Sequence, residues 1–343
     1  VDWDTPEHRV FEPKRMDFDA SVSDREAVEA REDLPDNGPR RDFMIRVEGP
    51  CVQDVSSMFH ERWSAAISGG AEYAENATPF MAEPYDGPAD GEILAQVVHT
   101  VPEPWAEMSF SESLAKAFAS AESYIFIENQ YFRSPIINDA LIETLLARPW
   151  VKLIVITWPI EPYEGGGKYT YLSDQLFRDL VPDQYLLLQA RSFDVVLEEG
   201  YIWDTRDLYS EQIDVHSKLA IVDDRFLSVG SANLNNRSML YDGETNVAVL
   251  DELWVSAERQ RLFENLVGPD RAYLVSDDAD ANFELFRQVA EDNQAIREDW
   301  EVWIDDLAFD DLVDLEDVYR PDGFLYPLTI DPDYWWDVGP DLF

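Results

Sequence analysis

One short pattern constrains this chain more than any other feature. It consists of the run His216-Ser-Lys-Leu-Ala-Ile-Val-Asp223, followed by Gly230-Ser231-Ala-Asn233. Residues 213–222 are rich in Ile, Val and Leu, which predicts a buried β-strand. Because side chains alternate along a strand, His216 and Lys218 would share one face, and a Gly-Ser turn would return Asn233 to it. An imidazole, an ammonium and an amide on one face predict a phosphate site.

Residue by residue, this pattern resembles the HKD motif of the phospholipase D superfamily, His-x-Lys-x4-Asp-x6-Gly-Ser-x-Asn. The alternative is a buried strand with one hydrogen-bonded His and a Lys whose ammonium reaches solvent, but five matched positions favour the motif. The resemblance implies phosphodiester cleavage through a phosphohistidine. One motif His attacks phosphorus, and the other protonates the leaving alcohol and then activates water or an acceptor alcohol.

The resemblance also implies a role for each motif residue. His216 would be the general acid/base, while Lys218 and Asn233 would hold the non-bridging phosphate oxygens. Glu244 would accept a hydrogen bond from the other ring nitrogen of His216 and fix its tautomer. Asp223 stands an odd number of positions from His216, so it would point away from the phosphate and serve the structure, as would Gly230 and Ser231.

The family fold needs two such motifs, and this chain contains one. Its four histidines are His8, His60, His99 and His216. None of the first three has a Lys two residues on and an Asp five residues further. The first residue is Val, so we expect a truncated or processed chain whose first motif, with the nucleophilic His, lay upstream.

Two segments support this expectation because they share a pattern. Asp42-Phe-Met-Ile-Arg-Val and Glu244-Thr-Asn-Val-Ala-Val each read as an acid, a short apolar strand and then an amphipathic helix. Such a unit follows each HKD strand in the family. Asp42 would therefore be the remnant of the first repeat, where its carboxylate served the missing first motif. A chance similarity of two strand-helix units is the alternative.

The segment Ile127-Glu-Asn-Gln-Tyr-Phe132 is also similar to one that opens the second repeat of phospholipase D-type enzymes. The alternative is a strand that ends in a polar turn. Gln130 and Tyr131 would lie at the carboxyl end of that strand, where α/β sheets place ligands. We expect both to line the substrate site.

The charge of the chain excludes several partners. Its 343 residues contain 71 acidic and 26 basic side chains, for a net charge of −45, and only five residues are Lys. This balance argues against binding to nucleic acid phosphates and to anionic membranes. At about 1 M salt the Debye length is about 3 Å, which removes most of the self-repulsion. We therefore expect a halophilic protein, cytoplasmic or peripheral to a membrane.

No apolar run reaches the about 20 residues of a membrane span, so no stable membrane anchor is expected. The single Cys51 cannot form an internal disulfide. No His/Asp/Glu cluster with ligand spacing accompanies the motif, so we expect neither a metal nor another cofactor.

The alternation of strand and helix patterns predicts an α/β fold with a mixed, mostly buried sheet and helices on both faces. Residues 1–67 would be the end of a first repeat and a crossing segment, and residues 68–268 a second repeat with the motif. Residues 269–343 would be an acidic, Trp-rich extension. Its tryptophans are too apolar to remain exposed, so we expect it to pack on the body; a disordered acidic tail is the alternative.

The leading hypothesis is a phospholipase D-like phosphodiesterase that acts on glycerophospholipids, with an alcohol as a second acceptor. The first alternative is a phosphatidyltransferase of cardiolipin-synthase type, and another is a non-catalytic remnant that serves as an interaction module. A nuclease that pairs two single-motif chains fits less well, because −45 repels DNA. Without the upstream repeat, these 343 residues are expected to be inactive.

Overall fold

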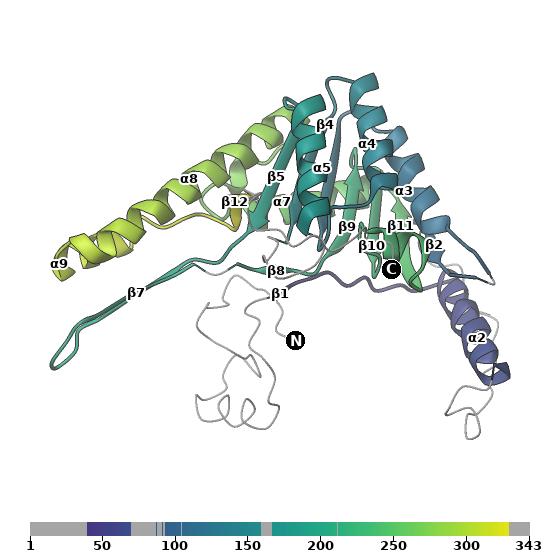
Figure 1. Cartoon of the computed structure of the whole chain (residues 1–343), viewed down its shortest axis with the longest axis horizontal. Helices are drawn as coiled ribbons and strands as arrows, with labels where there is room; N and C mark the ends of the chain where they lie inside the picture. The colour runs from purple at the N-terminus through teal and green to yellow at the C-terminus, as the bar shows by residue number, and fades with distance from the viewer. Residues whose placement is uncertain are drawn as a thin grey trace.

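The computed structural model describes residues 40–69, 87, 91, 93–103, 105–158, 167–210 and 212–328. Figure 1 shows one large sheet with helices packed on it and a long hairpin that extends to one side. Expectations for residues 1–39, for most of 70–92 and for Trp335 and Trp336 lie outside the described residues.

The central sheet has eight strands in the order β12-β5-β4-β3-β9-β10-β11-β2. In chain order they are β2 (Leu94–Thr100), β3 (Tyr124–Asn129), β4 (Lys152–Thr157), β5 (Tyr185–Ala190), β9 (Lys218–Val222), β10 (Phe226–Gly230), β11 (Glu244–Leu250) and β12 (Leu325–Pro327). Strands β3, β4 and β5 are parallel, and the other pairings are antiparallel. The predicted mixed sheet is confirmed.

Helices cover both faces of this sheet, which explains why its central strands are apolar at consecutive positions. One face packs against α3 (Ser109–Ala119), α4 (Pro135–Ala147) and α5 (Gly167–Leu180), and the other against α7 (Glu252–Val267) and α8 (Ala279–Asp306). In β3, Ile125 and Ile127 join the first core and Phe126 joins the second. A short helix, α6 (Asn236–Leu240), follows the β10 turn.

The start of α3 differs from the sequence prediction. The pattern Ser109-Phe-Ser-Glu112 is typical of a capping box and predicts a helix that begins at Ser113. In the structure the helix begins at Ser109 after Met108, and no side chain caps it. The Ser109 hydroxyl instead donates to Glu107 Oε1 at 2.7 Å. That bond ties the helix start to the preceding turn.

The described part of the segment after α7, which ends at Leu328, packs on the body, as predicted. It forms a 3₁₀ turn (Ala272–Leu274), the 28-residue α8, then α9 (Phe309–Glu316) and finally β12. Phe283 and Phe286 of α8 lie in the core, and Trp300 is fully buried. The sequence did not predict β12, which pairs with β5 and forms one edge of the sheet.

A hairpin outside the central sheet was also not predicted. Its strands are β6 (Asp194–Glu198) and β7 (Thr205–Tyr209), paired antiparallel. Their base packs against α8 and α9 through Val195, Trp300 and Leu312. The hairpin therefore extends from the β5 side of the molecule, in the same direction as α8 (Figure 1).

Residues 42–47 do not form the predicted strand. Only Arg40–Arg41 form a strand here, β1. It pairs parallel with β8 (Asp214–Val215), and this pairing ends at Arg41 and Val215. Residues 41–46 continue as an extended segment, called the strap below, toward helix α2 (Val52–Ser68). Phe43 and Ile45 of the strap pack against the core on the α7 face.

Candidate functional site

His216 lies in a break between two strands. The predicted continuous strand over 213–222 is wrong at this point, because β8 ends at Val215 and β9 begins at Lys218. The backbone N–H of His216 donates to the Arg41 carbonyl of the strap at 2.8 Å. The strap therefore fixes the backbone of the motif histidine.

The side chain of His216 is paired with Asp42. Its Nδ1 lies 2.7 Å from Asp42 Oδ2, and 36% of the imidazole is exposed. Because Nδ1 faces a carboxylate, it carries the proton in the neutral ring, and Nε2 is the basic nitrogen. Such an imidazole can accept a proton from, or donate one to, a group that approaches Nε2.

This geometry corrects the predicted roles of two acids. Glu244 was expected to accept from His216, but its carboxylate accepts from Ser231 Oγ at 2.6 Å and Ser238 Oγ at 2.5 Å. Asp42 was expected to serve the missing motif, yet its carboxylate is bonded to His216. The physical reason is the β1–β8 pairing, which brings the strap across the chain break at His216.

Lys218 is the buried cation of the site. Its Nζ donates to the backbone oxygen of His216 and lies 3.4 Å from Gln130 Oε1. Burial lowers the pKa of Lys218 to about 8, although the carboxylates of Asp42, Asp214 and Glu244 oppose the shift. The ammonium stands next to the motif histidine, where it could bind an anion.

Asn233 has a buried polar atom in the loop that follows β10. Its Oδ1 is inaccessible to solvent and has no hydrogen-bond partner among the described residues. The loop is anchored by Asn129, whose Oδ1 accepts from the N–H groups of Leu234 at 3.0 Å and Tyr131 at 3.1 Å. This anchor places Asn233 beside the segment that follows β3.

Gln130 and Tyr131 immediately follow the carboxyl end of β3. The Gln130 N–H donates to the Ser217 carbonyl at 3.1 Å, which places Gln130 beside the strand break. The Arg133 guanidinium stacks over the Tyr131 ring at 4.0 Å from its centroid. The structure thus brings Gln130 to Lys218, while Tyr131 lies against a cation.

Two other motif residues, Asp223 and Gly230, have structural roles in the turn and the strand that they occupy. Asp223 has a φ of 52° and accepts from three consecutive N–H groups, those of Glu122, Ser123 and Tyr124, at 2.6 to 2.9 Å. Gly230 packs so closely on β11 that a Cβ would lie 2.3 Å from the Thr245 oxygen. A larger residue at position 230 would therefore push β10 and β11 apart.

Glu128 is a site residue that the sequence analysis did not identify. It is fully buried, and its Oε1 accepts from Arg41 Nε at 2.8 Å and from Ser217 Oγ at 2.6 Å. It thereby contacts the neighbours in sequence of both Asp42 and His216. A charged residue inside the apolar run Ile125-Phe-Ile-Glu was the available signal, because buried acids are rarely left without a cation.

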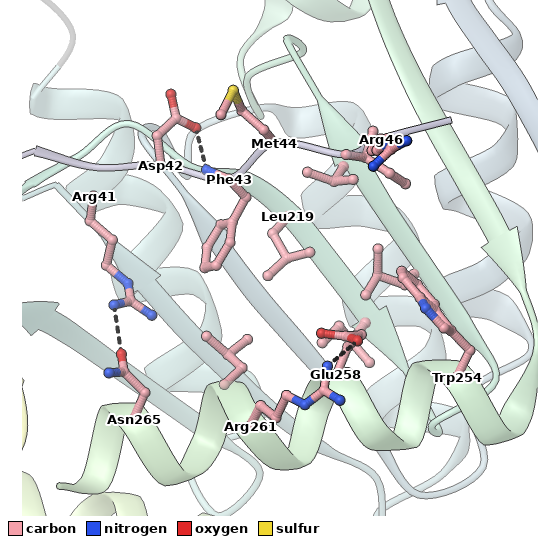
Figure 2. A pocket seen from close by; sticks show the side chains of 15 residues that line it. Arg41, Asp42, Phe43, Met44, Arg46, Leu219, Trp254, Glu258, Arg261 and Asn265 are labelled. Carbon is pink, nitrogen blue, oxygen red and sulfur yellow. Dashed lines mark hydrogen bonds and ion pairs between the residues drawn. The ribbon is translucent and has the colours of Figure 1, made fainter. Parts of the chain in front are cut away.

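A separate apolar cavity of about 550 Å³ lies beneath the strap (Figure 2). Figure 2 shows Phe43 directed into it, whereas Asp42 and Met44 point to the other side of the strap. Its floor comes from aliphatic residues of β9 and β10 and its wall from α7. The cavity therefore lies on the opposite side of the strap from the Asp42 carboxylate. It is distinct from the site formed by His216 and Asp42.

Within the described ranges, no group of three or more His, Cys, Asp and Glu side chains is arranged to hold a metal ion. None of the helices in the described part of the chain combines the length and apolar character of a membrane span.

Comparison with known sequences identifies several relatives. Residues 114–267 match a family described as cardiolipin synthase, PLD-like domain. Phospholipase D1 of Saccharomyces cerevisiae is 24% identical over 62% of this chain and 15% of its own length. Cardiolipin synthase of Oceanobacillus iheyensis is 26% identical over 62% of this chain and 37% of its own length. The chain thus spans well under half the length of these two relatives.

Solved structures give more distant matches. NucT from Helicobacter pylori aligns with a TM-score of 0.36 at 15% identity, over 50% of this chain and 93% of its own. Phosphatidylserine synthase from Haemophilus influenzae aligns with a TM-score of 0.33 at 18% identity, over 49% and 37%.

Proposed function

Because this chain belongs to the phospholipase D superfamily of phosphodiesterases and phosphatidyltransferases, we propose that it supplies one half of a glycerophospholipid phosphodiesterase site. The observation that carries the proposal is the 2.7 Å contact between His216 Nδ1 and Asp42, next to the buried Lys218. This arrangement presents a proton-transferring nitrogen and a cation to the same anion. It is the chemistry that cleavage of a phosphodiester needs.

His216 is the general acid/base of this proposal. A histidine from an upstream His-x-Lys-x4-Asp motif attacks phosphorus, and the bond from phosphorus to the leaving alcohol breaks. His216 Nε2 gives its proton to that alcohol oxygen and then accepts one from the water that hydrolyses the phosphohistidine. Asp42 accepts a hydrogen bond from Nδ1–H throughout, which fixes the orientation of the ring.

Lys218 and Asn233 bind the phosphoryl group. The Lys218 ammonium balances the charge on the non-bridging oxygens as it builds in the transition state. The Asn233 side chain supplies an amide donor, and its buried, unpartnered Oδ1 supports a position of this side chain inside the loop. Gln130 and Tyr131 line the edge of the site where the head group lies, and Gln130 holds the ammonium in place at 3.4 Å.

The position of Asp42 suggests a further role for Glu244. Asp42 comes from the end of the first repeat but orients the histidine of the second. Glu244 occupies the equivalent position of the second repeat, so it orients the histidine of the missing first motif. The hydroxyls of Ser231 and Ser238 hold its carboxylate at 2.6 and 2.5 Å in readiness for that contact.

An assay of the complete protein with phosphatidylcholine and phosphatidylethanolamine tests the function. We expect release of choline or ethanolamine at about 1 M salt, and no release from the His216→Ala protein at equal concentration. If the complete, folded protein releases no head group from any phospholipid, the hydrolase proposal fails and a non-catalytic module is left.

Phosphatidyl transfer is the second candidate, and the match of residues 114–267 to a cardiolipin synthase family favours it. The same preparation is given phosphatidylglycerol as donor and acceptor, and the lipid products are separated by mass. Cardiolipin with little free phosphatidic acid would assign transfer. Phosphatidic acid as the only product would assign hydrolysis.

A further inference from the structure

Three consecutive large side chains are exposed at the tip of the β6–β7 hairpin. Tyr201, Ile202 and Trp203 have relative exposures of 104%, 73% and 80%. They lie in the loop between Glu198 and Thr205, which form the last residue pair of the hairpin. Isolated apolar side chains are common on protein surfaces, but three adjacent ones at a projecting tip indicate a binding surface.

The base of the hairpin is anchored to the body of the protein, so the tip has a defined position. Val195 is buried against Trp300 and Leu312, and the Arg206 guanidinium donates to the Leu307 carbonyl at 2.8 Å. These contacts hold the lower part of the hairpin on α8 and α9. Figure 1 shows that the end of the hairpin extends away from the central sheet.

The chemistry of the tip selects its partner. Glu198, Glu199 and Asp204 flank the aromatic residues, and residues 198–205 include no Lys or Arg. Aromatic faces beside carboxylates attract quaternary ammonium and ammonium groups, which are the outer charges of zwitterionic phospholipids. Tyr and Trp also favour the membrane–water interface. The same carboxylates repel an anionic bilayer.

The size of the tip argues against a protein partner. Its three side chains can bury together about 600 Å², whereas a stable protein interface buries about 800 Å² on each partner. Insertion between lipid head groups has no such minimum area.

We propose that the tip of the β6–β7 hairpin is a bilayer-contact element that inserts Tyr201, Ile202 and Trp203 among the head groups of a zwitterionic phospholipid surface. The choice of lipid rests on the proposed function. The contact is reversible, and it would bring the protein to a surface made of its substrate.

Flotation with phosphatidylcholine vesicles tests the inference at about 1 M salt, where long-range charge effects are screened. The wild-type chain should float. The partition coefficient of the triple variant Tyr201→Ser, Ile202→Ser, Trp203→Ser should be lower by about tenfold or more, because buried apolar area determines interfacial binding. The matched control Leu253→Ser, Tyr273→Ser removes side chains with 86% and 81% exposure from the body and should float like wild type.

Lipids brominated near the head groups provide a second measurement. They should quench part of the Trp fluorescence of the wild-type chain, and Trp203→Phe should lose that part. Failure of the wild type to float, equal flotation of the triple variant, or binding only to anionic vesicles at low salt would each overturn the inference. Flotation is measured without turnover. A complete, folded protein that floats but releases no head group and makes no transfer product would therefore refute the proposed function and leave this inference standing.

Discussion

Arg41 and Glu128 form a buried ion pair, with Arg41 Nε 2.8 Å from Glu128 Oε1 and with 8% and 0% of the two side chains exposed. The pair joins the strap to strand β3. Since Glu128 also accepts from Ser217, one carboxylate is bonded to both segments that carry the His216–Asp42 contact.

Replacement of Glu128 by Gln should therefore destabilise the fold strongly. The Arg41 guanidinium would remain buried without its counter-charge, and removal of one partner of a buried pair costs about 3–5 kcal/mol. Urea unfolding measures the difference in the free energy of unfolding. Asn265→Ala removes a neutral 3.1 Å contact to the same guanidinium and should cost about 1 kcal/mol. Equal losses in the two variants would contradict a charge-specific role.

Asp42→Asn should reduce turnover of the complete enzyme by about 10²–10⁴-fold, comparable to His216→Ala. The amide can donate to His216 Nδ1, which favours the tautomer with the proton on Nε2. Nitrogen-15 NMR of the labelled histidines reports the tautomer in the chain alone. Glu244→Gln should leave the His216 spectrum unchanged. If Glu244→Gln shifts it and Asp42→Asn does not, the assignment of the orienting acid is wrong.

Lys218→Met should alter how stability depends on pH. The pKa of Lys218 is about 8 in the folded chain, below the ordinary value of 10.5. Between these two pH values the unfolded chain holds a proton on Lys218 that the folded chain lacks. The contribution of this group to the free energy of unfolding therefore increases as pH rises. Urea titrations from about pH 7 to about pH 10.5 should show a gain in wild type that the variant lacks. Parallel curves for the two proteins would refute the lowered pKa.

Asp223→Asn should act on stability. Asn also tolerates the φ of 52°, but the variant lacks the carboxylate that accepts hydrogen bonds from three backbone N–H groups. We expect a loss of about 2 kcal/mol or more in the free energy of unfolding, with turnover retained by the folded fraction of the complete protein. Asp242→Asn, at an exposed pair with Arg237, is the control and should change stability by less than about 1 kcal/mol. A large loss of turnover without a loss of stability would place Asp223 in the chemistry.

Salt should stabilise the chain. At a net charge of −45 the folded state is self-repelling, and the Debye length falls from about 10 Å at about 0.1 M salt to about 3 Å at about 1 M. The midpoint of thermal unfolding should rise across this range in both sodium and tetramethylammonium chloride. A midpoint that does not change would contradict the halophilic interpretation.

Local patterns predicted much of the fold. The apolar periodicity of residues 252–267 predicts a helix, and these residues form α7. Asp251 caps it by accepting from the Trp254 N–H at 2.7 Å. Period and composition suffice for such elements because their signals lie within one turn or one strand. Two elements that the sequence did not predict, β12 and the β6–β7 hairpin, depend on distant packing. The edge position of β12 is set by its pairing with β5, more than a hundred residues earlier.

For the candidate site, local spacing indicated residues but not their pairings. His216 and Lys218 were identified because their spacing is local, whereas the orienting acid was assigned to Glu244, which follows them in the chain. The acid bonded to His216 is Asp42, which is 174 residues away in sequence. Nothing in local periodicity encodes the β1–β8 pairing that joins them.

The strap has a consequence for how such a chain can be divided by evolution. A gene that encoded only the residues after the strap would still encode every strand of the central sheet. Its product would retain the motif histidine but would lose the carboxylate that orients the ring. Fission of the gene at that boundary would thus yield a folded sheet whose His216 ring has no orienting carboxylate. The few residues around Asp42 must therefore remain on the same polypeptide as His216.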